Sequence, residues 1–147
     1  MQTQALLDFF LRDLDKLVAE VEAMPTEESL WRVGGDVKNP VGTLALHIAG
    51  NLQHFIGAIM GDTGYVRARA QEFSARDVAR RDIVAALATA RDVLKSVLGK
   101  MQDAQLDEPY PAEHFGENRT TFFALLTLLT HLNYHLGQVN YLRRLFA

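Results

Sequence analysis

The chain has 147 residues, a length typical of one compact domain, and we expect a single domain over residues 1–147. It contains no cysteine, which excludes disulfides, thiolate metal sites and cysteine nucleophiles. Its 15 basic and 18 acidic side chains give a net charge of −3. Nucleic acid is therefore not an expected partner, because no overall positive field would hold a phosphate backbone.

We expect neither a secretory signal nor a membrane span in the N-terminal segment. Acidic residues interrupt its apolar stretch, unlike the apolar centre of a signal peptide. No apolar run in the chain reaches the roughly 18 residues that a spanning helix needs. We expect a soluble cytoplasmic protein with no membrane partner, and the lack of cysteine is compatible with that reducing compartment.

The first predicted helix covers about residues 3–24. Apolar residues recur along it every three or four positions, the spacing that makes one face of a helix apolar. Pro25 then prevents the helix from continuing. The apolar positions are Leu7, Phe10, Leu14, Leu17, Val21 and Met24.

The second predicted helix begins at Asn39 and Pro40, read as an N-cap and a first-turn proline, and ends at Gly61 and Asp62. Its core stripe is Val41, Ala45, Ile48, Leu52, Phe55 and Ile59. Small residues form a band along one flank, where another helix can approach closely. Packing within the monomer is the favoured reason for this band, and a homodimer interface is the alternative. The band consists of Thr43, Gly50, Gly57 and Gly61.

Two more helices are predicted towards the C-terminus. Ser74 with Asp77 is a candidate capping pair for the third helix, whose apolar stripe is Ile83, Leu87, Ala90, Leu94, Val97 and Met101. The fourth begins at Thr120 or Thr121 and continues to about Leu145. One stripe of this helix carries Ala124, Leu128, His131, His135, Gln138 and Leu142.

No segment shows the two-residue alternation of a strand, so the predicted class is all-α, with four helices. The connections have about 16, 15 to 20, and 16 to 18 residues, far more than antiparallel neighbours in a simple bundle require. At least one is long enough to run the length of the bundle and join two parallel helices. We therefore expect a four-helix bundle with long crossover connections.

The strongest chemical signal is the pair His131 and His135 in the fourth helix. A spacing of four places both rings on one helix face, one turn apart, within reach of a single metal ion. Burying two unpaired imidazoles on an apolar stripe would be costly, and a metal ion would account for them. The alternative is an ordinary pair of hydrogen-bonded histidines.

His47 is the natural third ligand, because it lies beside the core stripe of the second helix. Three nitrogen donors from two helices leave coordination positions open for water or substrate, as in catalytic sites. His54 lies two turns from His47, too far to share the ion, and is expected in the pocket or in a structural role. Asn51 and Gln138 are candidates to hold the ligand imidazoles or to orient a substrate. The alternative is that they only provide hydrogen bonds in an otherwise dry polar patch.

Other polar residues are assigned less specific roles. His114, in the loop with Pro109 and Pro111, is expected to be solvated. The group Arg67, Arg69 and Glu72 is interpreted as an ion-pair clip that fixes its loop, with an anion site as the alternative. No GxGxxG, P-loop, HExxH or nucleophile elbow is present, so hydride transfer and phosphate-loop chemistry have no support.

Three segments together resemble the DinB superfamily of metalloenzymes, in particular a DinB-like branch without an assigned reaction. They are LWRVGGDVKNPVG, HIAGNLQHFIGAIMGDTGYVRARAQEF and HLNYHLGQVNYLRR. The resemblance implies a four-helix bundle with an up-down-down-up course. It also implies a divalent metal ion held by His47, His131 and His135. Relatives of known activity include transferases and isomerases that use a small cellular thiol.

Two functions follow as hypotheses. The first is a metal-dependent enzyme acting on a small molecule, either a thiol-dependent S-transferase or a hydrolase. Imidazole donors suit zinc, nickel, copper and iron, of which we expect zinc or nickel, and any reacting thiol must be a low-molecular-weight cosubstrate because the chain has no cysteine.

The second hypothesis is a non-catalytic metal-binding or oligomerising bundle. A closed structural site would normally have four protein ligands, so three favour the enzyme. A homodimer is also predicted, from the apolar surface of the second helix and from two apolar flanks of the fourth. These flanks contain Leu125, Leu129, Leu132 and Leu136.

Overall fold

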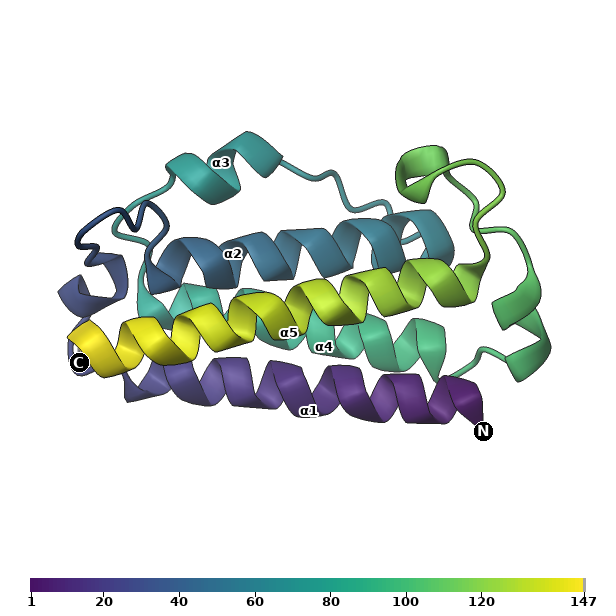
Figure 1. The fold of residues 1–147 in the computed structure, drawn as a ribbon, viewed down its shortest axis with the longest axis horizontal. Helices are drawn as coiled ribbons and strands as arrows, with labels where there is room; N and C mark the ends of the chain where they lie inside the picture. Colours follow the sequence, from purple (N-terminus) through teal and green to yellow (C-terminus); the bar gives the residue numbers. More distant parts are fainter. Residues whose placement is uncertain (147) are drawn as a thin grey trace.

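A computed structural model describes residues 1–146, and Ala147, the last residue of the predicted domain, lies outside the described residues. These residues are mainly helical, and their only β-type pairing is an isolated bridge between Pro109 and Thr120. Four long helical segments form a bundle (Figure 1), which confirms the predicted all-α class. They are α1 (Gln2–Ala23), α2 (Val41–Leu52) continued by the π-helix η2 (Gln53–Met60), α4 (Arg80–Leu98) and α5 (Thr121–Phe146).

The helices follow an up-down-down-up course. In Figure 1, α1 and α5 run in one direction and α2 and α4 in the other. The connection over residues 61–79 therefore returns along the bundle, beside α2, and contains the short helix α3 (Arg69–Ser74). Short 3₁₀ helices occupy the other connections: η1 (Glu28–Trp31), η3 (Asp103–Asp107) and η4 (Glu113–Phe115).

The predicted apolar stripes meet in the centre of the bundle. Each long helix contributes side chains with at most 2% of their surface exposed, among them Phe10, Leu14, Ile48, Leu52, Ile83, Leu87, Leu94, Ala124 and Leu128. Burying a large apolar side chain stabilises the fold by roughly 1.5 to 3 kcal/mol before conformational entropy is subtracted. The buried apolar side chains form one core that is continuous through all four helices.

Two predicted helix caps are wrong. Pro40 itself occupies the N-cap position of α2, with an extended backbone and no side-chain cap bond, so Asn39 does not cap the helix. Ser74 ends α3, and Ala79 is the N-cap of α4. The N–H of Arg80, at the start of α4, instead donates to the Glu27 carboxylate at 2.8 Å, a partner that lies 53 residues away.

The small-residue band of α2 and η2 packs within the monomer, as favoured. A Cβ on Gly57 would lie 3.1 Å from Val93, and one on Gly61 would lie 2.5 Å from Val97. Both valines belong to α4, which therefore approaches η2 where the side chains are absent. The band gives no support to an interface between copies.

The surface differs from what the homodimer prediction assumed. Leu125, Leu132 and Leu136 are buried within the chain, and α2 is buried along nearly its whole length. The large apolar side chains that α5 does expose are Phe122, Phe123, Leu126, Tyr134, Tyr141 and Leu145. Among the described residues, no helix is both long enough and apolar enough to cross a membrane.

Candidate metal centre

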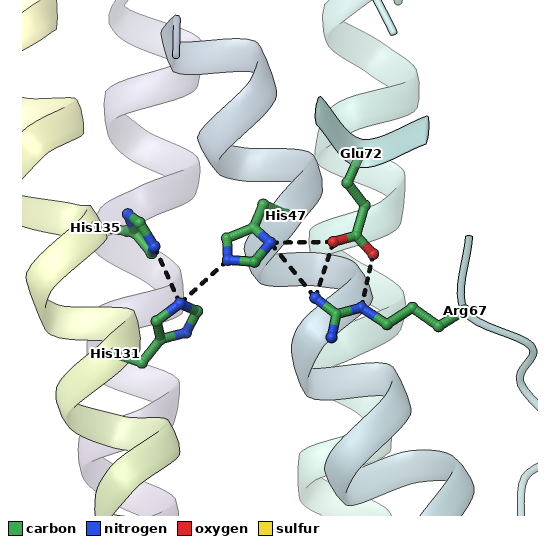
Figure 2. A network of polar contacts seen from close by, with 5 residues as sticks. All are labelled: His47, Arg67, Glu72, His131 and His135. Carbon is green, nitrogen blue, oxygen red and sulfur yellow. Dashed lines mark hydrogen bonds and ion pairs between the residues drawn. The ribbon is translucent and has the colours of Figure 1, made fainter. Parts of the chain in front are cut away.

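Three histidine rings converge between α2 and α5 (Figure 2). The Nε2 atom of His131 lies 3.1 Å from Nε2 of His47 and 3.0 Å from Nε2 of His135. His47 is buried, and the other two rings are partly buried. These three residues form a group whose ligand atoms all lie within 4.8 Å of one another and which could hold a metal ion. The structure therefore brings together the three histidines that the sequence singled out.

Hydrogen bonds on the outer nitrogens decide the tautomers of two rings. Nδ1 of His47 lies 3.0 Å from Oε1 of Glu72, and because a carboxylate only accepts, Nδ1 carries the proton and donates. Nδ1 of His135 likewise donates to Oε1 of Gln138 at 2.7 Å. In both neutral rings the lone pair is then on Nε2, directed into the cluster.

The third ring is poorly satisfied by protein alone. Nδ1 of His131 is buried and has no hydrogen-bond partner among the described residues. If Nδ1 carries the proton, a buried donor is unpaired and three Nε2 lone pairs face one another. If Nε2 carries it, a buried acceptor is unpaired. A cation between the three Nε2 atoms would accept all three lone pairs, so the donor set fits a metal ion.

The surroundings keep the imidazoles of His131 and His135 neutral. Burial lowers the pKa of His131 to about 4, with further contributions from His135 and His47. Burial also lowers the pKa of His135, although its bond to Gln138 opposes this. At neutral pH, protons therefore do not compete with a metal ion for the Nε2 atoms of these two rings.

Glu72, predicted from the sequence to be part of an ion-pair clip, makes an unpredicted contact with His47. Its carboxylate is buried and accepts two bonds from Arg67, from Nε to Oε2 and from Nη2 to Oε1, each at 2.9 Å (Figure 2). Burial alone would raise the pKa of Glu72, but the hydrogen bonds from His47 and Arg67 outweigh it and lower the pKa. Glu72 is thus an ionised carboxylate that fixes His47 and is itself fixed by Arg67.

The predicted ion-pair clip is present only in part. Arg67 pairs with Glu72, but Arg69 lies over the ring of Phe73, 5.0 Å from its centroid. The clip interpretation also treated Glu72 as a loop residue, whereas α3 carries it against α2 and beside His47. Only the returning course of residues 61–79 creates this contact.

The three predicted supporting residues differ in position. Gln138 bonds to His135, as described above. Asn51 is buried, and its Oδ1 has no hydrogen-bond partner among the described residues. The ring of His54 packs against that of Phe55, with the two centroids 4.7 Å apart. His54 does not support the ligand rings, because the Nδ1 atoms of His47 and His135 bond to Glu72 and Gln138. Burial, followed by the charge of Arg67, lowers the pKa of His54.

Two cavities adjoin the histidine cluster. The larger, of about 590 Å³, is lined by His135 and Gln138 together with residues 36–39 and the exposed tyrosines of α5. The smaller, of about 250 Å³, is lined by His47, His131 and Asn51 and by residues from the connections over 61–79 and 99–120. The cluster therefore borders both cavities, one at His135 and the other at His47 and His131.

Comparison with known proteins agrees with this architecture. The sequence pattern described as the DinB superfamily matches residues 10–139, from α1 to the later part of α5, and includes all three clustered histidines. A search of curated proteins gives no match. Because the family match extends over most of the helical bundle, the chain belongs to the DinB superfamily.

Proposed function

We propose that this chain is a metal-dependent enzyme that binds one divalent ion, zinc or nickel, through His47, His131 and His135. The observation that carries the proposal is the meeting of three Nε2 atoms at 3.0 and 3.1 Å. Imidazole nitrogen is a ligand that both metals accept. Three protein ligands leave coordination positions open, as catalytic sites require.

The proposed chemistry is the activation of a small nucleophile. A divalent ion held by three neutral imidazoles would supply a Lewis acid that lowers the pKa of a thiol or of water. The chain has no cysteine, so a reacting thiol enters as a cosubstrate. A thiol-dependent S-transferase is one form of the proposal and a hydrolase is the other. A reduced thiol cosubstrate is compatible with a cytoplasmic location.

The residues around the cluster have defined tasks in this proposal. Glu72 and Gln138 accept the Nδ1 protons of His47 and His135, which fixes the orientation of both rings. Arg67 holds the Glu72 carboxylate in place through two hydrogen bonds. The cavities on both sides provide room for substrates. A solely structural ion would need no such access, which favours the enzyme over a non-catalytic metal-binding bundle.

Two reactions test the two forms of the proposal. In the first, the sulfur of free cysteine displaces chloride from 1-chloro-2,4-dinitrobenzene, and the thiol proton is released to solvent. The second is hydrolysis of 4-nitrophenyl acetate. We expect zinc or nickel loading to accelerate at least one reaction, and chelation or His135→Ala to abolish the gain. If one ion binds per chain and neither rate exceeds that of His135→Ala, the non-catalytic bundle is the correct function.

We also propose a homodimer formed through the outer face of α5. The exposed apolar side chains of this helix lie on one face, and nothing lies within 4 Å of where a Cβ on Gly137 would be. Several large apolar side chains exposed on one helix face are typical of protein contacts. The side chains on this face are Phe122, Phe123, Leu126, Tyr134, Tyr141 and Leu145.

A further inference from the structure

The smaller cavity has the dimensions of a site for a small organic molecule. Its volume of about 250 Å³ is slightly below the roughly 300 to 1,000 Å³ of typical ligand pockets, so it suits a small ligand. His47 and His131 form part of its wall. A molecule bound there would lie directly against the histidine cluster.

The charge of this cavity is positive. Its lining includes Arg67 and Arg69 and contains no carboxylate. Glu72 offsets the charge of Arg67, but no ion pair of Arg69 is found within residues 1–146. The bonds from Arg67 to Glu72 use Nε and Nη2, so Nη1 remains available. By contrast, the larger cavity has opposite charges in its wall, from Asp36 and Lys38.

A buried amide in the same wall lacks a partner. Asn51 has only 7% of its surface exposed, and its Oδ1 forms no hydrogen bond within the described residues. An unpaired buried acceptor is costly. Oδ1 itself has almost no exposed surface, so the amide must turn toward the cavity before a ligand hydroxyl or N–H group can supply the missing donor.

Three aromatic residues, together with Thr127 and Leu128, form the rest of the lining. The ring of Phe55 lies 4.5 Å from that of His114 and 5.1 Å from that of Phe115. The hydroxyl of Tyr110 donates to the Phe55 carbonyl at 2.7 Å, which holds the connection before α5 against η2. Rings arranged in this way pack well against a flat, apolar body.

From these four features we infer that the smaller cavity binds a small planar carboxylate that also carries a hydrogen-bond donor. The carboxylate lies near Arg69 and Nη1 of Arg67, the planar body packs against His114 and Phe115, which cover the buried ring of Phe55, and the donor bonds to Asn51. This inference rests on the proposed function, because it names the substrate class of that site.

The probe for the test is 4-hydroxybenzoate, compared with its uncharged counterpart 4-hydroxybenzamide and with benzoate, which lacks the hydroxyl. Titration calorimetry of the zinc-loaded protein at pH 7 measures the three affinities. We expect 4-hydroxybenzoate to bind about tenfold or more tightly than the amide, because hydrogen bonds to charged groups contribute most. We expect benzoate to bind more weakly than 4-hydroxybenzoate.

Single substitutions in the two cavities test where 4-hydroxybenzoate binds. Arg69→Gln should weaken 4-hydroxybenzoate binding about fivefold or more, and Arg69→Lys should restore most of the affinity, since it keeps the charge. Asn51→Leu should remove the difference between 4-hydroxybenzoate and benzoate. The matched control is Lys38→Gln in the larger cavity, which should leave all three affinities unchanged. Circular dichroism checks that each variant is folded.

Three results would overturn the inference: equal binding of acid and amide, no effect of Arg69→Gln, or a loss of affinity in Lys38→Gln. A separate zinc titration reports on the proposed function. If zinc does not bind, the metal proposal fails, and the same probes on the metal-free protein still test the cavity. Its arginines belong to the chain, so the preference for the acid and its dependence on Arg69 should persist without zinc.

Discussion

The carboxylate of Glu72 accepts the Nδ1 proton of His47 at 3.0 Å, and it does so in a space that exists because residue 50 is glycine. A Cβ at Gly50 would lie 2.0 Å from Oε2 of Glu72. Since Arg67 holds the carboxylate from the other side, Glu72 cannot move without losing a partner. The orientation of His47 therefore depends on Glu72, and the position of Glu72 depends on the absence of a side chain at Gly50.

Gly50→Ala should weaken zinc binding without removing a ligand. The added methyl group displaces Glu72, His47 loses its fixed orientation, and the zinc dissociation constant should rise about 10- to 100-fold. Competition with a chromophoric chelator measures this change. The matched control is Gly137→Ala in α5, where nothing lies within 4 Å of the new Cβ. Unaltered zinc affinity in Gly50→Ala would show that Glu72 does not position His47.

Glu72→Leu should destabilise the fold because it leaves Arg67 as a buried cation without a partner. The side chains of Arg67 and Glu72 are 10% and 8% exposed. Removing one member of a buried pair typically costs about 3 to 5 kcal/mol. The double variant Arg67→Met with Glu72→Leu should recover most of this loss, since no charge remains. Urea unfolding measures both effects, and equal destabilisation by the single and double variants would contradict the account.

The metal-free protein should lose stability as the pH falls below 6.5. The pKa of His131 is about 4 in the folded chain, against 6.5 for an unperturbed histidine. Between these values the unfolded chain binds more protons, so the free energy of unfolding increases with pH. Urea unfolding in the presence of chelator at pH 7, 6 and 5 should show this slope. The slope should be smaller in His131→Leu, and an identical slope would exclude His131 as its source.

Disruption of the exposed face of α5 should dissociate the proposed homodimer. Leu126→Glu places a charge on that apolar face, beside Phe122 and Phe123, where an interface would have to bury it. Light scattering should then report the monomer mass of 16.5 kDa for the variant and twice this mass for the unaltered protein. Val66→Glu is the control, because Val66 is 87% exposed and lies in the connection after η2. A monomeric unaltered protein at micromolar concentration would refute the dimer.

The features that the sequence predicted well are those that depend on local spacing. The periodicity of apolar residues predicts the four long helices, because each helix must bury one face. The spacing of His131 and His135 places both rings on one side of α5, and the phase of His47 places it on the inner side of α2. These relations are set within single helices, so they are visible in the sequence.

The features that the sequence did not predict depend on contacts between distant segments. Asp103 accepts hydrogen bonds from the backbone N–H groups of Gln2 and Thr3 and so caps α1 from the connection before α5. Glu72 reaches His47 only because residues 61–79 return beside α2. The change from α- to π-helix at Gln53 is likewise not visible in the apolar pattern. Chain topology, rather than local preference, decides each of these.

Three of the five histidines are proposed to bind one divalent ion, and zinc titration of five single His→Ala variants measures which of them do. Each variant is stripped with chelator, checked for its helical circular dichroism, and titrated with zinc at pH 7. The account predicts one ion per chain for the unaltered protein and for the His54 and His114 variants. It predicts loss of stoichiometric binding, with the helical fold kept, for the variants of His47, His131 and His135. Stoichiometric zinc in any of these last three, at unchanged affinity, would contradict it.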